Sequence, residues 1–373
     1  MKNNETLSWL RLIRSEGVGP VTFDKLLAEF DTAERALAAM HTLRSRGKPL
    51  VAANEKDVEK EYHALLKLGG QFLLKNSAAY PENLRNISDA PPVLSAIGNI
   101  ELLQKPMLAI VGVRNASVNG RKLAATLARD LAAAGFVIVS GMARGIDSAA
   151  HEAAIETGTI AVLANGVDIA YPPENKKLYD AIAQRGLLLS ENALGLEPST
   201  QLFPRRNRIV SGLCQGVIVV EASFKSGSLI TARCALDQGR EVFAVPGNPM
   251  DPRANGPNAL IKNGQAHLIE SAEDVLQAFS TFPSRAVEAA LAALNTPDSD
   301  NEDTSPEEGN DQPGLTDDQT RQMVLNCLSQ TACLIDDIVL TSRLPVPRVL
   351  SVLMELELTG QVQRLSGNRV VRV

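Results

Sequence analysis

The chain has 373 residues, of which 45% are apolar, and it carries a formal net charge of -6. This length and composition predict a globular protein of two or three domains, and the negative charge argues against a general attraction to nucleic acid. No run approaches the ~18 apolar residues of a membrane span, and the first fifteen residues lack the apolar core of a signal peptide, so we expect a cytoplasmic protein without membrane insertion.

The first 75 residues are expected to form short helices. Apolar residues recur at helical spacing in segments 7–13, 23–30 and 33–40. The turn Gly17-Val18-Gly19-Pro20 joins the first two segments, as in a helix-hairpin-helix. Glycines in such a turn allow backbone N–H groups to approach a phosphate. A plain turn of a helical bundle remains the alternative, because few basic residues flank it.

Residues 106–280 alternate between strand-like and helix-like segments. The strand-like segments are continuous apolar runs, as in parallel strands buried on both faces. They are Met107–Val111, Phe136–Val139, Thr159–Leu163, Leu187–Leu189, Val217–Val220 and Glu241–Val245. This βαβ rhythm predicts an α/β fold with a Rossmann-like, doubly wound parallel sheet. Its ligand crevice should lie at the carboxyl ends of the strands.

Two glycine-containing turns follow the first two of these strands. In the first turn, Gly112 and Arg114 combine backbone donors with a guanidinium, and Ser117 opens the next helix, which favours anion binding. An ordinary turn with a solvated arginine is the alternative. In the second turn, Gly141 and Gly145 permit close backbone approach and Ser140 can donate to a phosphate. Asp147 is expected to cap the next helix, and His151 to form structural hydrogen bonds, because neither has a catalytic partner nearby.

The densest basic cluster of the chain is Phe203-Pro204-Arg205-Arg206-Asn207-Arg208. Phosphate-neutralising arginines beside an aromatic ring suit a single-stranded nucleic acid, although a solvated helix end is the alternative. A fourth loop follows a buried strand and offers Lys225, Ser226, Gly227 and Ser228 at a helix start. It resembles a phosphate cradle but lacks the spacing of a Walker loop, so nucleotide hydrolysis is not indicated. The segment 245–249 should form the neighbouring wall of the crevice.

The last 91 residues divide into a linker and a small domain. Residues 286–320 contain ten acidic residues and no Lys or Arg. The rest of the chain therefore carries about +4, from -6 plus 10, and is mildly basic, so local clusters of charge matter more than the total. We expect an acidic, disordered linker at 283–315. Segments 316–328, 334–340 and 346–358 read as helices, with a hairpin around Ser366-Gly367-Asn368. This order is typical of a winged helix.

The ordered set of loops resembles the DNA-processing protein A (DprA/Smf) family. The similarity runs through GVRNAS, SGMARGIDSAAH, YPPEN, FPRRNRI, EASFKSGSLITA and VPGNP. Val113 and Asn119 stand where the family usually has Ser and Tyr. The resemblance implies an extended Rossmann domain, a helical, sterile-alpha-motif-like domain before it and a winged helix after it. It also implies binding of single-stranded DNA, loading of the RecA recombinase in natural transformation, and homodimer formation through the Rossmann domain.

These inferences predict four segments, namely a helical domain at 1–75, the DNA-binding domain at 76–282, the linker at 283–315 and the winged helix at 316–373. The residues expected to contact DNA are Gly112, Arg114, Ser117, Ser140, Gly141, Gly145, Phe203, Arg205, Arg206, Asn207, Arg208, Lys225, Ser226, Gly227 and Ser228. We expect no catalytic residue, metal or cofactor, because no Cys–His, Ser–His or carboxylate pair has suitable spacing.

Two other functions remain open. A phosphoribohydrolase-like enzyme would use the same kind of crevice, although Pro246-Gly247-Asn248-Pro249 replaces the glycine-rich loop of such enzymes. Base release from nucleoside monophosphates would favour it. A duplex-binding regulator would use the winged helix. Its expected recognition helix carries Glu355 and Glu357 beside a single Arg348, which favours an auxiliary role for that domain.

Overall fold

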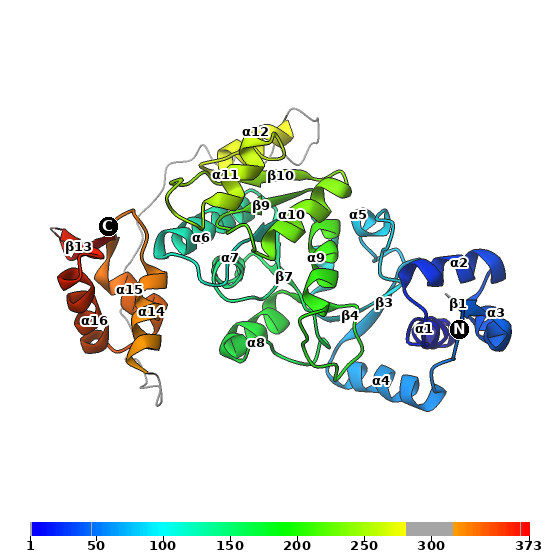
Figure 1. Cartoon of the computed structure of the whole chain (residues 1–373). Coiled ribbons are helices and arrows are strands. Elements are labelled where there is room, and N and C mark those ends of the chain that lie inside the picture. Colours follow the sequence, from blue (N-terminus) through cyan, green and yellow to red (C-terminus); the bar gives the residue numbers. More distant parts are fainter. Residues whose placement is uncertain (1, 46, 281–315, 366) are drawn as a thin grey trace.

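The computed structural model describes residues 2–45, 47–280, 316–365 and 367–373. Along the chain these residues form a helical N-terminal part, a central α/β part and a small C-terminal part, with the N- and C-terminal parts on opposite sides of the central sheet (Figure 1). The expected linker at 283–315 lies outside the described residues. No helix among the described residues is long and apolar enough to cross a membrane.

The N-terminal part contains helices α1 (Lys2–Ile13), α2 (Pro20–Phe30), α3 (Ala33–Ala39) and α4 (Glu55–Lys67), the short 3-10 helix η1 (Met40–Thr42) and the hairpin of β1 (Arg44–Ser45) and β2 (Lys48–Pro49). Side-chain caps begin α3 and α4, where Thr32 and Asn54 accept backbone N–H groups. Leu10, Leu12 and Phe23 are fully buried at the centre of this part.

One nine-stranded sheet forms the central part, in the order β11-β10-β9-β5-β6-β7-β8-β4-β3. Its strands are β3 (Gln71–Leu74), β4 (Val93–Gly98), β5 (Met107–Val111), β6 (Val137–Ser140), β7 (Thr159–Val162), β8 (Leu187–Ser190), β9 (Gly216–Val219), β10 (Glu241–Ala244) and β11 (His267–Leu268). Seven strands run parallel, and β4 and β3 extend the sheet antiparallel beside β8. The expected doubly wound α/β fold is confirmed. Strands β3, β4 and β11 were not predicted from the sequence.

Helices cover both faces of this sheet, and strand β5 shows why. Leu108 and Ile110 face one core, and Met107, Ala109 and Val111 face the other, because side chains alternate along a strand. Helices α6 (Val118–Ala133), α7 (Ile146–Ala154) and α12 (Ala272–Ser280) pack on the first face, and α9 (Leu202–Leu213) and α10 (Ser228–Asp237) on the second. The remaining helices are α5 (Glu82–Arg85), η2 (Ile100–Gln104), η3 (Pro173–Asn175), α8 (Lys176–Arg185) and α11 (Asn255–Lys262).

The C-terminal part is a winged helix, as expected. It contains α14 (Asp317–Cys327), β12 (Cys333–Leu334), α15 (Ile335–Ser342), α16 (Val346–Leu358), β13 (Val362–Leu365) and β14 (Arg369–Arg372). Thr316 and Gln319 form a capping box that begins α14. Strand β14 is central in the sheet order β12-β14-β13. Val324, Val349 and Leu353 are fully buried between the helices.

Candidate nucleic-acid interface

A cavity of about 590 Å³ lies where β5, β6 and β9 end, and we call it the crevice. Parallel strands present their carboxyl ends at one edge of the sheet, so the loops that follow them converge there. The structure brings these predicted residues together in its lining: Gly112, Arg114, Gly141, Phe203, Arg206, Asn207, Lys225, Ser226, Gly227 and Ser228. Arg114, Arg206 and Lys225 therefore share one cavity although more than a hundred residues separate the first from the last.

The loop after β5 presents Arg114 to solvent at the crevice. The Val113 amide donates to the Glu221 carbonyl oxygen at 2.8 Å, which fixes this loop on the end of β9. The Arg114 guanidinium lies 5.1 Å from the centre of the Phe203 ring, within the range of a cation–π contact. The Phe203 ring in turn lies 5.9 Å from that of Tyr171. An exposed cation thus lies against the Phe203 ring at the crevice, and Tyr171 packs against that ring.

The loop after β6 is folded by a buried carboxylate. The Asp147 carboxylate accepts the backbone N–H groups of Gly141 at 3.1 Å and Ala143 at 3.3 Å. Asp147 was expected to cap the next helix, but it lies inside α7, and Gly145 is the N-cap residue instead. Burial raises the pKa of the Asp147 carboxyl, and nearby Arg206 together with these hydrogen bonds opposes that effect. Asp147 therefore shapes the backbone of the turn that lines the crevice.

Arg206 is buried behind the turn that contains Gly141, at the lining of the crevice. Its side chain is buried, and its Nη1 donates to the carbonyl oxygen of Val162 at 2.5 Å. Burial lowers the pKa of Arg206 to about 10, with Asp147 opposing the effect, so the guanidinium remains charged at neutral pH. Gly141 lies directly against this guanidinium, and a Cβ at that position would overlap it. Arg206 thus places a positive charge under the glycine turn, near enough to buried Asp147 to favour its ionised form.

The loop after β9 leads into the N-terminus of α10. Lys225 is exposed at the crevice, and the hydroxyls of Ser226 and Ser228 are 2.6 Å apart. The Asn207 side chain donates from Nδ2 to the Gly227 carbonyl oxygen at 3.1 Å, which ties the start of α10 to α9. The positive end of the α10 dipole and the Lys225 ammonium therefore act on the same space, an arrangement that attracts anions.

Five predicted residues do not line the crevice. Ser117 caps α6 and donates its hydroxyl to Glu221 at 2.6 Å, and the buried Ser140 hydroxyl donates to the Ile110 carbonyl oxygen at 2.6 Å. Gly145 packs against the backbone of Val113 and Arg114.

Arg205 and Arg208 face a second cavity of about 840 Å³, which also includes Gly17 and Gly19 of the N-terminal turn. Arg208 forms ion pairs with Asp89 at 3.2 Å and with Glu191. Direct DNA contact by any of the fifteen residues remains a prediction.

His151 forms a structural hydrogen bond. Its Nδ1 lies 2.8 Å from the Thr159 hydroxyl oxygen in the buried core, and burial lowers the pKa of His151 to about 3. Among the described residues, no group of three or more His, Cys, Asp or Glu side chains is arranged to hold a metal ion.

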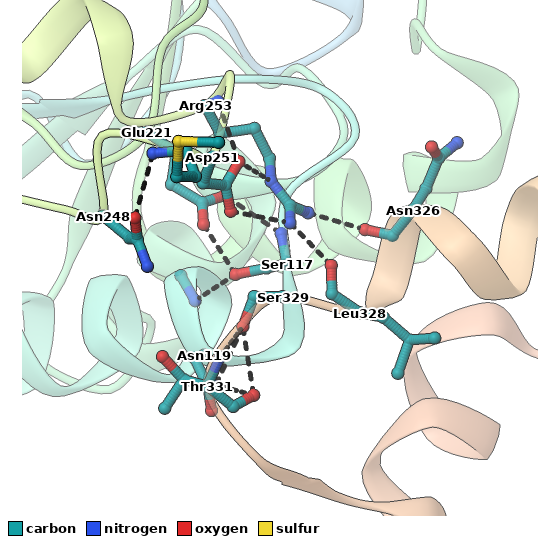
Figure 2. A network of polar contacts seen from close by, with 12 residues as sticks. Ser117, Asn119, Glu221, Asn248, Asp251, Arg253, Asn326, Leu328, Ser329 and Thr331 are labelled. Carbon is teal, nitrogen blue, oxygen red and sulfur yellow. Dashed lines mark hydrogen bonds and ion pairs between the residues drawn. The ribbon is translucent and has the colours of Figure 1, made fainter. Parts of the chain in front are cut away.

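Sequence reasoning missed one side of the crevice. Asp251, Pro252 and Arg253 complete its wall, together with Leu325, Asn326 and Arg372 of the winged helix. The segment 245–249 was expected to form this wall, but the chain reaches the crevice only after a turn at Asn248–Asp251. Figure 2 shows Arg253 between Asp251 and the carbonyl groups of the winged helix. No local pattern could have indicated these residues, because they meet only through contacts between two domains.

Comparison with family models matches all three parts of the chain. Residues 71–280 match the model described as DNA recombination-mediator protein A. Residues 3–64 match a DprA-like N-terminal HHH domain, and residues 307–368 match a DprA winged helix domain.

Known proteins are similar to this chain over long stretches. Protein Smf of Synechocystis is 31% identical over the full length of both chains. The DNA processing protein DprA of Streptococcus pneumoniae is 48% identical over 54% of this chain and 71% of that protein. A crystal structure of the S. pneumoniae protein superposes with a TM-score of 0.57 at 42% identity, and covers 60% of this chain and 78% of that one.

A structure of DNA processing protein A from Helicobacter pylori is described as showing a single-stranded DNA binding mode. It superposes with a TM-score of 0.53 at 34% identity, covering 57% of this chain and 96% of that one.

Proposed function

The chain belongs to the DprA/Smf family of DNA recombination-mediator proteins, and on that premise we propose that it binds single-stranded DNA in the crevice and loads RecA onto the bound strand. The observation that supports this most directly is the convergence of Arg114, Lys225 and the N-terminus of α10 on one open cavity. Each of these groups favours a phosphate, and none of them recognises a particular base.

A single strand fits this cavity better than a duplex. The Phe203 ring lies beside the Arg114 guanidinium and is backed by Tyr171, so an unpaired base could stack close to the cation that neutralises its phosphate. In a duplex the base faces are stacked on one another and unavailable. Because few aromatic side chains reach the crevice, phosphate contacts should provide most of the affinity.

Binding can be tested by fluorescence polarisation with labelled oligo-dT and a duplex of equal length. We expect tighter binding of oligo-dT, and weaker binding by a Lys225→Ala variant. Lys67→Ala is the matched control, because Lys67 is exposed at the end of α4 and lines neither cavity. Equal affinities of the Lys225→Ala variant and the wild type would remove the crevice from the proposal.

We further propose that the protein acts on RecA as a homodimer formed through the Rossmann domain, as the family resemblance implies. Light scattering should give twice the mass of the chain. RecA assembly on an oligo-dT strand should be faster in the presence of the protein, and the Lys225→Ala variant should lose that stimulation. Normal stimulation by a variant that cannot bind the strand would separate the RecA function from the crevice.

We propose that the crevice binds DNA without altering it. Asp147 is engaged by backbone N–H groups, and His151 is buried away from solvent beside Thr159, so neither has the setting of a general base. Incubation with nucleoside monophosphates should release no free base. Release of a base, lost in the Asp147→Asn variant, would favour the phosphoribohydrolase-like alternative.

A further inference from the structure

The winged helix borders the crevice, and Arg253 contacts it there (Figure 2). The Arg253 guanidinium is held by the Asp251 carboxylate through Nε at 3.1 Å and Nη2 at 3.0 Å. Its remaining donors reach the winged helix, with Nη1 donating to the Asn326 carbonyl oxygen at 2.9 Å and Nη2 to that of Leu328 at 2.6 Å. All three guanidinium nitrogens are therefore occupied while the two domains are in contact.

This contact provides hydrogen-bond donors for carbonyl groups at the C-terminus of helix α14. The last carbonyl groups of a helix have no partner within it and carry the negative end of the helix dipole. In α14 a cation from another domain satisfies two of the carbonyl groups at this end, those of Asn326 and Leu328. Burial opposes ionisation of Asp251, but the hydrogen bonds from Arg253 outweigh it and lower the pKa of the Asp251 carboxyl. The pair is thus charged and fixed at neutral pH.

A second set of contacts lies along the start of α6. The Asn119 side chain donates from Nδ2 to the Ser329 hydroxyl oxygen at 3.3 Å and to the Thr331 carbonyl oxygen at 3.3 Å (Figure 2). The Lys122 ammonium pairs with the Asp337 carboxylate at 2.6 Å. Val118 packs into the apolar core of the winged helix. Two separate surfaces of the central part therefore position this domain.

The contact changes the charges that a polyanion meets at the crevice. It engages Arg253, which lines the crevice, and brings the carbonyl end of α14 to the lining. In return the winged helix supplies one exposed cation, Arg372. A phosphate chain at this end of the crevice therefore meets backbone carbonyl groups in place of a free Arg253 Nη1, and Leu325 and Asn326 bound the space that is open to it.

From these observations, and resting on the proposed binding of single-stranded DNA, we propose that the winged helix and the DNA strand compete for the same end of the crevice. The domain is a displaceable cover, and the strand enters fully when α14 and the 328–331 turn move away from Arg253 and Asn119. Apart from Val118, the side chains that join the two domains through Arg253, Asn119 and Lys122 make polar contacts, which is typical of domain interfaces that separate readily.

A reversible lock tests this competition in the full-length protein. Asn119 and Ser329 are in side-chain contact across the interface, so an Asn119→Cys, Ser329→Cys variant can be joined by a disulfide. Should that bond not form, Lys122→Cys and Asp337→Cys joined by a short bis-maleimide provide the same lock. We expect the oxidised protein to bind oligo-dT at least ten-fold more weakly than the same protein after reduction. The Asn119→Cys single variant is the control for oxidation.

The outcomes separate the two proposals. If the reduced form binds oligo-dT and the locked form binds it equally well or better, the competition is wrong and the winged helix is a permanent wall. If the reduced form, the locked form and the wild type all fail to bind, the proposed function itself is wrong.

A charge exchange gives an independent check without a covalent bond. Asp337→Lys replaces the attraction to Lys122 by repulsion and should raise the affinity for oligo-dT two- to five-fold. Asp336→Lys is the matched control, because it makes the same charge change at the exposed neighbouring position of α15. The double variant Lys122→Asp, Asp337→Lys restores the pair and should return the affinity to that of the wild type. An equal effect of Asp337→Lys and Asp336→Lys would contradict the proposal.

Discussion

At the scale of single residues, the arginine cluster on α9 shows how differently neighbouring cations are used. Arg206 is buried beneath Gly141, Arg205 faces the second cavity, and Arg208 is paired with two carboxylates. Of the cations exposed in the crevice, Arg114 and Lys225 come from two other loops and Arg372 from the winged helix. A basic cluster in the sequence therefore indicates charge but does not reveal which side chains are available to a ligand.

Substitution of Arg114 and Arg206 should separate binding from stability. Arg114→Ala should weaken oligo-dT binding by about 1–3 kcal/mol, the value of a charge-assisted hydrogen bond, with unchanged urea unfolding. Arg206→Ala should lower the free energy of unfolding by about 3–5 kcal/mol, because it leaves the buried Asp147 carboxylate without its cation. Polarisation and urea titrations measure the two effects. An Arg206→Ala variant with normal stability would contradict the supporting role given to this residue.

His151 makes stability depend on pH in the acidic range. Burial lowers the pKa of His151 from 6.5 to about 3, so between these values the unfolded chain binds a proton that the folded protein does not. The free energy of unfolding is therefore highest above pH 6.5. Below that pH it decreases as the pH falls toward 3, by at most about 1.4 kcal/mol per pH unit. Urea unfolding at pH 7 and pH 5 should show a smaller loss for His151→Gln than for the wild type. Equal decreases in the free energy of unfolding for the variant and the wild type would exclude His151 as the cause.

At the scale of elements, strands that are continuous apolar runs could be predicted from the sequence. Strands that depend on pairing with a strand distant in the sequence could not. Met107–Val111 is apolar throughout and is a buried central strand, as predicted. Residues 71–74 and 93–98 form an antiparallel edge whose pairing depends on β8, about a hundred residues later. In the crevice, the loops themselves could be predicted. The internal partners of Ser117 and Ser140 could not, because Glu221 and Ile110 are distant in the sequence.

Gly145 should matter for two crevice loops at once. It has a φ of +82°, and a Cβ there would overlap the carbonyl oxygens of Val113 and Arg114. Gly135 is a matched control, with a φ of +93° and open space around a Cβ. Gly135→Ala should lower the free energy of unfolding by about 1–2 kcal/mol, because alanine is strained in the left-handed conformation. It should leave DNA binding unchanged. Gly145→Ala should cost more and also weaken oligo-dT binding. If Gly145→Ala and Gly135→Ala had the same stability and the same affinity for oligo-dT, the close packing of the loops against Gly145 would be contradicted.

At the scale of the whole molecule, the distribution of charge matters more than its sum. The chain carries -6 overall, yet exposed cations from the loops after β5 and β9 and from the winged helix meet in one crevice. The domain limits inferred from the sequence remain predictions. The sheet itself begins at β3, within the stretch that the sequence assigned to the helical domain.

Salt dependence should report these cations directly. The logarithm of the binding constant for a single strand falls with the logarithm of the salt concentration by about 0.7 per neutralised phosphate. Removing Arg114 and Lys225 together should flatten that slope by about 1.4, because two phosphate contacts are lost. Polarisation titrations at several salt concentrations give the slope. If the slope is unchanged while the affinity falls, the two side chains do not neutralise phosphates.

Helix α9 stands between the two large cavities and presents its first turn to both. Phe203 and Arg206 line the crevice, and Pro204 and Arg205 line the cavity beside the N-terminal turn. Under the proposed binding mode, a strand that fills the crevice and continues past Pro204 would enter that neighbouring space. The position of a single helical turn would then govern the number of nucleotides that one molecule covers, and oligonucleotides too short to pass it should leave Arg205 uninvolved.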